Sequence, residues 1–116
     1  MTDSELLELA AKAAGIDAAI DMYGLDEVGN LRIDANDPPT VWNPLTDDGD
    51  ALRLAVNLKL AVRPLDKCVF VESDPETLLG QSSVSELEMY ANYSDFYTAT
   101  RRAIVRAAAE IGKELT

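Results

Sequence analysis

Hydrophobic residues recur at helical spacing in three stretches of the chain. The first is SELLELAAKAAG, residues 4–15, where the pattern predicts an amphipathic helix. Polar residues at positions 2–4 can cap its start, and Gly15 suits the left-handed conformation that ends many helices. The predicted apolar face consists of Leu6, Leu9, Ala10 and Ala13.

The second helix is expected over residues 48–60, shortly after WNPL. Leucine, alanine and valine are dense enough in this stretch to predict a well-buried helix. Its predicted stripe contains Leu52, Ala55, Val56 and Lys59, widened by Leu54 and Leu58.

The third helix has the strongest pattern and is expected within residues 91–116. Ser94 is a natural N-cap with Asp95 in the first turn, and Lys113 lies near the C-terminal end, where a positive charge is favourable. The predicted apolar stripe contains Phe96, Ala99, Ala103, Ile104, Ala107, Ile111 and Leu115.

Alternating or β-branched residues predict strands between these helices. Residues 61–63 and 67–73 are either the two strands of a hairpin or one strand with a break. Residues 84–90 (VSELEMY) predict a last strand, and residues 16–24 and 30–34 could each form a short one.

This order of elements predicts one α+β domain over residues 1–116. Helices on both faces of a small, mainly antiparallel sheet would bury all three stripes, so the expected architecture is a single-domain α/β/α sandwich. With 116 residues, 47% of them hydrophobic, the chain is long enough for a true core.

The charge of the chain narrows the class of partner. It has 21 acidic and 10 basic residues, which gives a formal net charge of −11. Such a field repels nucleic-acid phosphates, so direct DNA or RNA binding is not expected, whereas binding to a basic protein surface is favourable. No apolar run approaches the roughly 18 residues of a membrane span, and the acidic N-terminus is unlike a signal peptide, so we expect a cytoplasmic protein.

The side chains that most often carry out catalysis are scarce. The chain has no histidine and its only cysteine is Cys68, so it cannot by itself assemble a cysteine-based zinc site or a Ser-His-Asp or Cys-His nucleophile. We therefore expect a protein that is not an enzyme, with no catalytic residues, no metal and no cofactor. A pair of facing carboxylates is the enzymatic alternative, but any acidic protein offers such pairs.

Three aspartates, Asp47, Asp48 and Asp50, crowd together in TDDGD. They are too tightly clustered for a calcium loop, which alternates its ligands and needs an acid about a dozen residues from the first. We expect Thr46 or Asp47 to cap the following helix, while the other acids complement its positive end. A small-ligand or cation-binding module that uses these aspartates and Trp42 is the alternative.

Three tyrosines lie close together just before and within the last helix and could form a recognition patch. Trp42 is expected to anchor its loop by packing under the helix, with ligand stacking as the alternative. Residues 36–39 include two prolines and predict an irregular loop. The candidate partner-binding residues are Tyr90, Tyr93, Tyr97, Asp37 and Trp42.

Two longer strings, WNPLTDDGDALRLAV and YTATRRAIVRAAAEIG, closely resemble small proteins of tailed phages and prophages of Gram-negative bacteria, grouped as the phage ABA-sandwich family. The resemblance covers residues 42–60 and 97–112, together with LLELAAKAAGI near the N-terminus. It implies helices packed on both sides of a sheet, and it brings no catalytic residue or cofactor. The chain departs from the family pattern in residues 16–41 and 64–93, where differences in partner would lie.

We therefore expect a small acidic phage or prophage accessory protein that binds a host or phage protein. A sharper expectation is an inhibitor of a host defence complex, such as an anti-CRISPR protein that occupies a basic nucleic-acid channel by mimicry. A homodimer through the last helix or a sheet edge is also plausible, because a small domain leaves apolar surface to cover.

Overall fold

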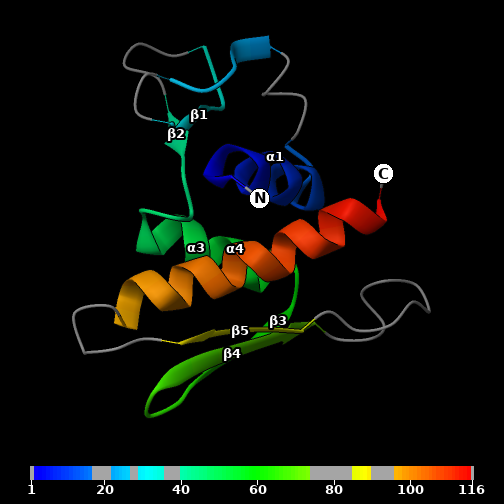
Figure 1. Ribbon diagram of the computed structural model, residues 1–116. Helices are drawn as coiled ribbons and strands as arrows, with labels where there is room; N and C mark the ends of the chain where they lie inside the picture. Colours follow the sequence, from blue (N-terminus) through cyan, green and yellow to red (C-terminus); the bar gives the residue numbers. More distant parts are fainter. Residues whose placement is uncertain are drawn as a thin grey trace.

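The elements of the computed structural model follow one another largely in the predicted order (Figure 1). The structure describes residues 2–16, 22–26, 29–35, 40–73, 85–89 and 96–115. The helices and strands are α1 (Asp3–Ala14), β1 (Leu31–Arg32), β2 (Val41–Trp42), α3 (Asp48–Asn57), β3 (Leu60–Pro64), β4 (Cys68–Ser73), β5 (Ser85–Met89) and α4 (Phe96–Glu114).

The first helix, α1, has the boundaries that its sequence predicts. The hydroxyl of Thr2 accepts a hydrogen bond from the backbone N–H of Glu5 (3.2 Å), and Gly15 ends the helix with a φ of 80°. An oxygen-bearing N-cap and a left-handed glycine satisfy backbone groups that the helix leaves unpaired. The buried face is slightly rotated from the predicted one and consists of Leu6, Leu7, Ala10 and Ala11.

The second helix, α3, starts as predicted but presents a different face to the core. It ends at Asn57, and Lys59 takes a φ of 56°, a left-handed conformation that stops the helix before residue 60. The predicted stripe was wrong for Leu52 and Val56, which are 64% and 66% exposed. Lys59 is exposed as well, whereas Leu54, Ala55 and Leu58 are buried as predicted and Ala51 is buried in addition.

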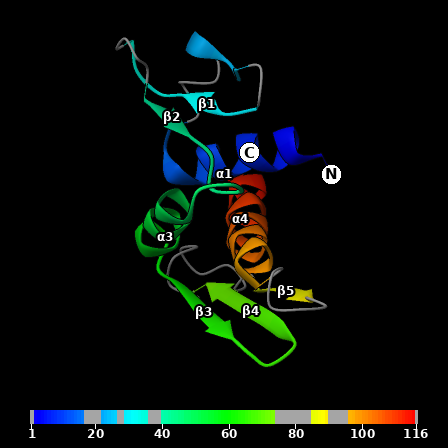
Figure 2. The same cartoon turned by 90° about the vertical axis from the view of Figure 1, so that its left-hand side faces the viewer.

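The long helix α4 lies at the centre of the molecule (Figure 2), packed against α1 on one side and against β4 and β5 on the other. Most of the predicted stripe is confirmed, but Leu115 is 57% exposed. Because two layers cover it, α4 buries more residues than one stripe provides, a pattern typical of helices inside a protein. The additional buried residues are Val105, Ala108, Ala109 and Gly112.

The three-stranded sheet has the order β3-β4-β5 and is antiparallel throughout. Of the two interpretations for residues 61–73, the hairpin is confirmed: Val62 pairs with Val71, and the N–H of Leu65 donates to the carbonyl of Cys68 (2.8 Å) across the turn. On β4, alternate residues Val69 and Val71 are fully buried beneath α4. The predicted α+β class with a small antiparallel sheet is therefore confirmed.

The order of the layers differs from a sheet with helices on both faces. In the described part of the chain, α4 and α3 lie on one face of the sheet, and α1 covers the far side of α4 (Figures 1 and 2). Together the three helices and the sheet enclose one connected core. The order is thus sheet, then α4 with α3, then α1.

A second, two-residue antiparallel ladder joins β1 and β2 beyond α1, with Leu31 opposite Trp42. The short strand predicted at residues 30–34 corresponds to β1, while β2 was not predicted. The strand considered for residues 16–24 is wrong at Met22 and Tyr23, which are helical, and residues 17–21 lie outside the described ranges.

Candidate functional site

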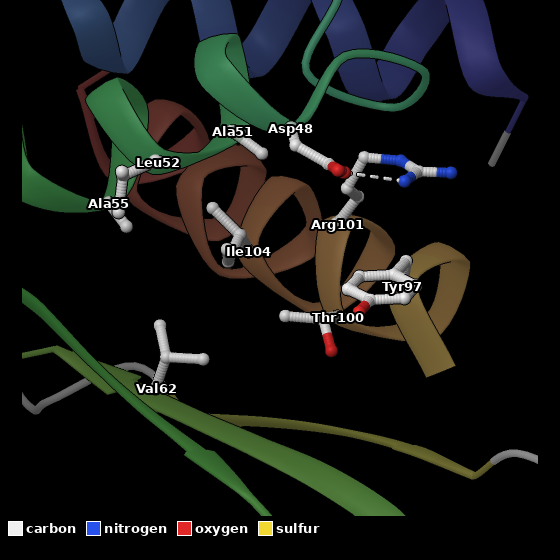
Figure 3. Close-up of a pocket in the computed structure, with 9 residues that line it drawn as sticks. All are labelled: Asp48, Ala51, Leu52, Ala55, Val62, Tyr97, Thr100, Arg101 and Ile104. Carbon is white, nitrogen blue, oxygen red and sulfur yellow. Dashed lines mark hydrogen bonds and ion pairs between the residues drawn. The ribbon is translucent and has the colours of Figure 1, made fainter. Parts of the chain in front are cut away.

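A groove of about 300 Å³ opens where α3, α4 and β3 meet (Figure 3). Its walls are mostly carbon, and polar groups gather at one end, where Asp48 and Arg101 face each other. This volume is at the lower limit of the range found for ligand-binding pockets. The groove therefore fits about one or two large apolar side chains better than a whole cofactor. The lining residues are Asp48, Ala51, Leu52, Ala55, Val62, Tyr97, Thr100, Arg101 and Ile104.

Apolar side chains also stand exposed along the rim of this groove. Leu52 is 64% exposed, Val56, one turn further along α3, is 66% exposed, and Tyr97 at the start of α4 is 64% exposed. Scattered apolar residues are normal on a protein surface, but Leu52 and Tyr97 line one apolar groove and Val56 lies one helical turn beyond Leu52, so the three gather exposed apolar surface at and beside it. We call Leu52, Val56 and Tyr97 the apolar rim.

Arg101 fixes the polar end of the groove. Its Nε donates to the carbonyl of Leu45 (2.9 Å), Nη1 to Asp48 (2.6 Å) and Nη2 to the hydroxyl of Thr98 (3.3 Å). The side chain is 18% exposed, so this forked contact ties α4 to the start of α3 largely out of water. Arg101 is thereby occupied by the protein itself and has little capacity left to bind an anionic ligand.

The aspartate cluster caps α3, as the sequence predicts. Asp47 is the N-cap, and its Oδ2 accepts a hydrogen bond from the backbone N–H of Asp50 (2.8 Å). Asp50 in turn accepts from the backbone N–H of Asn43 (2.9 Å) and from Arg53 (2.8 Å). All three carboxylates thus have partners within the protein, since Asp48 pairs with Arg101.

The loop before α3 is held by Asn43, which is buried. Its side-chain amide donates to Asn30 (2.9 Å), and its side-chain oxygen accepts from the backbone N–H of Leu45 (3.0 Å). Such a network leaves few buried polar groups without a partner. Asn43 therefore orients the loop that delivers Asp47 and Asp48 to the start of α3.

The predicted partner-binding residues are not brought together in the described part of the chain. Trp42 is only 8% exposed and packs in the core, which leaves little of its ring for a partner. Tyr97 is exposed at the groove, and its ring meets that of Phe96 edge-on at 5.7 Å between centroids. Tyr90, Tyr93 and Asp37 lie outside the described residues.

The remaining arginines of α4 are ion-paired with neighbouring elements. Arg106 contacts Glu88 of β5 at 2.7 Å, and Arg102 contacts Asp3 of α1 at 3.2 Å and Glu88 at 3.7 Å. At least six of the ten basic residues form such pairs: Arg53, Arg63, Arg101, Arg102, Arg106 and Lys113. The acidic residues in excess therefore set the sign of the surface.

Sequence reasoning missed Leu52 and Val56 as surface residues because it assigned them to the core. A second helical phase in the same stretch, at spacings of three, four and seven from Ala51, signals that the buried face is ambiguous, but it does not decide which phase is buried. Within the described ranges, no group of three or more Cys, Asp or Glu side chains is placed to hold a metal ion. None of the described helices is long and apolar enough to span a membrane.

Comparison of the chain with protein-family models gives no match, and neither the curated proteins nor the solved structures include a significant match. The resemblance to small phage proteins therefore stays a prediction.

Proposed function

We propose that the protein acts by binding another protein, and that the groove between α3, α4 and β3 is the docking site. The observation that carries the proposal is the apolar rim beside an apolar groove of about 300 Å³. Protein interfaces centre on a few large apolar or aromatic anchors that fill such pockets. Leu52, Val56 and Tyr97 offer the corresponding surface on this side.

Charge supports a basic partner. The chain carries a net charge of −11, and the carboxylates of Asp47 and Asp48, at the polar end of the groove, are 58% and 69% exposed. A field of this sign accelerates encounters with positively charged surfaces and repels acidic ones. The partner is thus a protein of the host or phage. Its docking segment carries positive charge and apolar residues that fill the groove.

The biological setting of this proposal comes from the resemblance to phage and prophage proteins. In a narrower form of the proposal, the partner is a host defence complex, and the protein binds a basic surface of that complex that normally holds nucleic acid. The alternative module for a small ligand or cation gains no support from the geometry, because the described residues place no group of three or more acidic side chains to hold a metal ion, and Arg101 is already engaged within the protein.

Affinity capture from bacterial cells, read out by mass spectrometry, tests the proposal with paired variants. Leu52→Asp places a charge on the apolar rim, while Leu115→Asp makes the same change at the other end of α4, at a similarly exposed position (57%). We expect a protein captured by the wild type and by Leu115→Asp but lost with Leu52→Asp. Equal capture by all three chains would refute the groove as the docking site.

A further inference from the structure

Building on the proposed function, we propose that the partner docks as an amphipathic helix that runs antiparallel to α3 and carries Lys or Arg in its last turn. The groove accepts its apolar anchors, and the charges at the two ends of α3 set its direction.

A row of side chains along α3 provides the contact surface. Asp48, Leu52 and Val56 follow one another at intervals of four residues, so they form one ridge on the side of α3 that flanks its buried face. Asp48 and Leu52 also line the groove. A partner helix whose own apolar residues are four apart can pack against this ridge and place a side chain in the groove.

The two ends of this row carry opposite charges. At the start of α3 the carboxylate of Asp48 is 69% exposed, and that of Asp47 is 58% exposed. Just beyond the end of α3, Lys59 is exposed, and its left-handed conformation turns the chain away from the helix axis. The surface along α3 is therefore acidic at the start of the helix and apolar at Leu52 and Val56, and a lysine lies just beyond the end of the helix.

This polarity selects a direction for the partner helix. Cations are favourable in the last turn of a helix and anions in its first turn. A helix that meets Asp48 with a basic last turn and Lys59 with an acidic first turn satisfies both preferences, and it lies antiparallel to α3. From Asp48 to Asn57 the helix α3 spans about 14 Å, which matches a partner helix of about two to three turns.

An extended partner strand is less favourable. β3 is an edge strand of the described sheet, and Val62 lies beside the groove, so its outer edge is a conceivable site for strand addition. However, Pro64 has no N–H to donate, and the exposed Lys59 and Arg63 at the two ends of β3 are features that protect sheet edges from pairing.

A second copy of this chain is also disfavoured as the occupant. Its α3 has a similar row, but each copy adds a net charge of −11, so bringing two copies together concentrates negative charge. A basic helix from another protein meets no such repulsion. Sedimentation equilibrium separates the two cases directly, because a dimer through this row depends on Leu52.

The test uses labelled full-length protein, nuclear magnetic resonance and synthetic peptides of about twelve residues. The forward peptide is an amphipathic helix with Glu in its first turn, Leu residues four apart and Lys in its last turn. The reversed peptide exchanges the Glu and Lys turns, and a third peptide of alternating Val and Lys is extended. A spin label at the C-terminus of the forward peptide reports its direction.

We expect the forward peptide to bind more tightly than the other two, with amide shifts along α3 and line broadening near Asp48 rather than Lys59. Leu52→Asp should weaken binding by at least about tenfold, and Lys59→Glu by about two- to fivefold. Leu115→Asp should leave it unchanged. Broadening near Lys59, preference for the extended or reversed peptide, binding of none of the three, or a dimer abolished by Leu52→Asp would each overturn the inference.

These outcomes can be told apart from a failure of the proposed function. If a natural partner is lost with Leu52→Asp but binds through an extended segment, the groove remains the docking site and only the proposal of a partner helix is refuted. If the binding of the partner is unchanged by Leu52→Asp, both the docking site and the partner helix are refuted.

Discussion

Replacing Gly112 with alanine tests the close packing of α4 against α1. Gly112 is buried in α4 where it crosses α1, and a Cβ at this position would meet the backbone carbonyl of Leu9, with the carbonyl carbon at 2.8 Å and the Cα at 3.2 Å. These atoms belong to the backbone of a helix, so no side-chain rotation can relieve the overlap. α1 and α4 would have to move apart.

The expected loss of stability follows from two opposing terms. Overpacking a core typically costs about 1–3 kcal/mol, and a clash with backbone belongs at the upper end of that range. Alanine favours the helical conformation over glycine by about 0.8–1 kcal/mol. We therefore expect Gly112→Ala to lower the free energy of unfolding by about 2 kcal/mol, which corresponds to a fall in Tm of about 8 °C or more.

Gly49→Ala is the matched control, because Gly49 also lies in a helix. Its Cβ would meet the guanidinium of Arg53 at 3.1 Å and the carboxylate of Asp47 at 3.2 Å, and the Arg53 side chain is 68% exposed and can move away. Here the helical preference should dominate, with a gain of at most about 1 kcal/mol. Urea denaturation followed by far-ultraviolet circular dichroism measures both variants. A Gly112→Ala protein as stable as the wild type, or an equal loss in both variants, would refute the packing argument.

Further substitutions at four positions test the ends of α3 and its contacts by urea denaturation. Arg101→Lys should lower the free energy of unfolding by about 1–2 kcal/mol, because one ammonium group cannot replace the forked contact that includes Asp48; unchanged stability would contradict this. Asn43→Ala should lower it by about 1–3 kcal/mol, since its half-buried partners Asn30 and Leu45 lose their hydrogen bonds to a buried side chain. Lys59→Gly should raise it by about 1 kcal/mol, because glycine adopts a positive φ without strain; a decrease would show that the Lys59 side chain stabilises the fold. Asp47→Ala should cost about 1 kcal/mol, whereas Asp47→Asn, an equally good N-cap, should cost little; equal losses would contradict a capping role.

Most of the helix boundaries could be predicted because they depend on neighbouring residues. Thr2 and Gly15 delimit α1, and Asp47 caps α3, through contacts that reach no further than four residues along the chain. The hairpin of β3 and β4 is likewise local. The two-residue strands β1 and β2 are too short for any periodic pattern, and their pairing comes from residues ten or so apart, so β2 escaped prediction.

The face that α3 buries could not be chosen from its sequence. The stretch ALRLAVNLKL is apolar in two overlapping helical phases, one through Leu52 and Val56 and one through Leu54 and Leu58. Both satisfy the same periodic rule, so the choice depends on where α4 and β3 lie. The structure selects the second phase, which leaves Leu52 and Val56 on the surface and so creates the apolar rim.

The sequence by itself determined the α+β class, the caps of α1 and the N-cap of α3, the acidic surface and the absence of histidine chemistry, because these depend on composition and on short-range contacts; the predicted cap Ser94 lies outside the described residues. The tertiary structure alone decided that α4 is covered on two sides, that Arg101 reaches from α4 to Asp48 and the loop before α3, and that a groove opens beside α3. Each of these joins segments that lie far apart along the chain. A groove is formed by the relative placement of three elements, and no local pattern within any one of them encodes that placement.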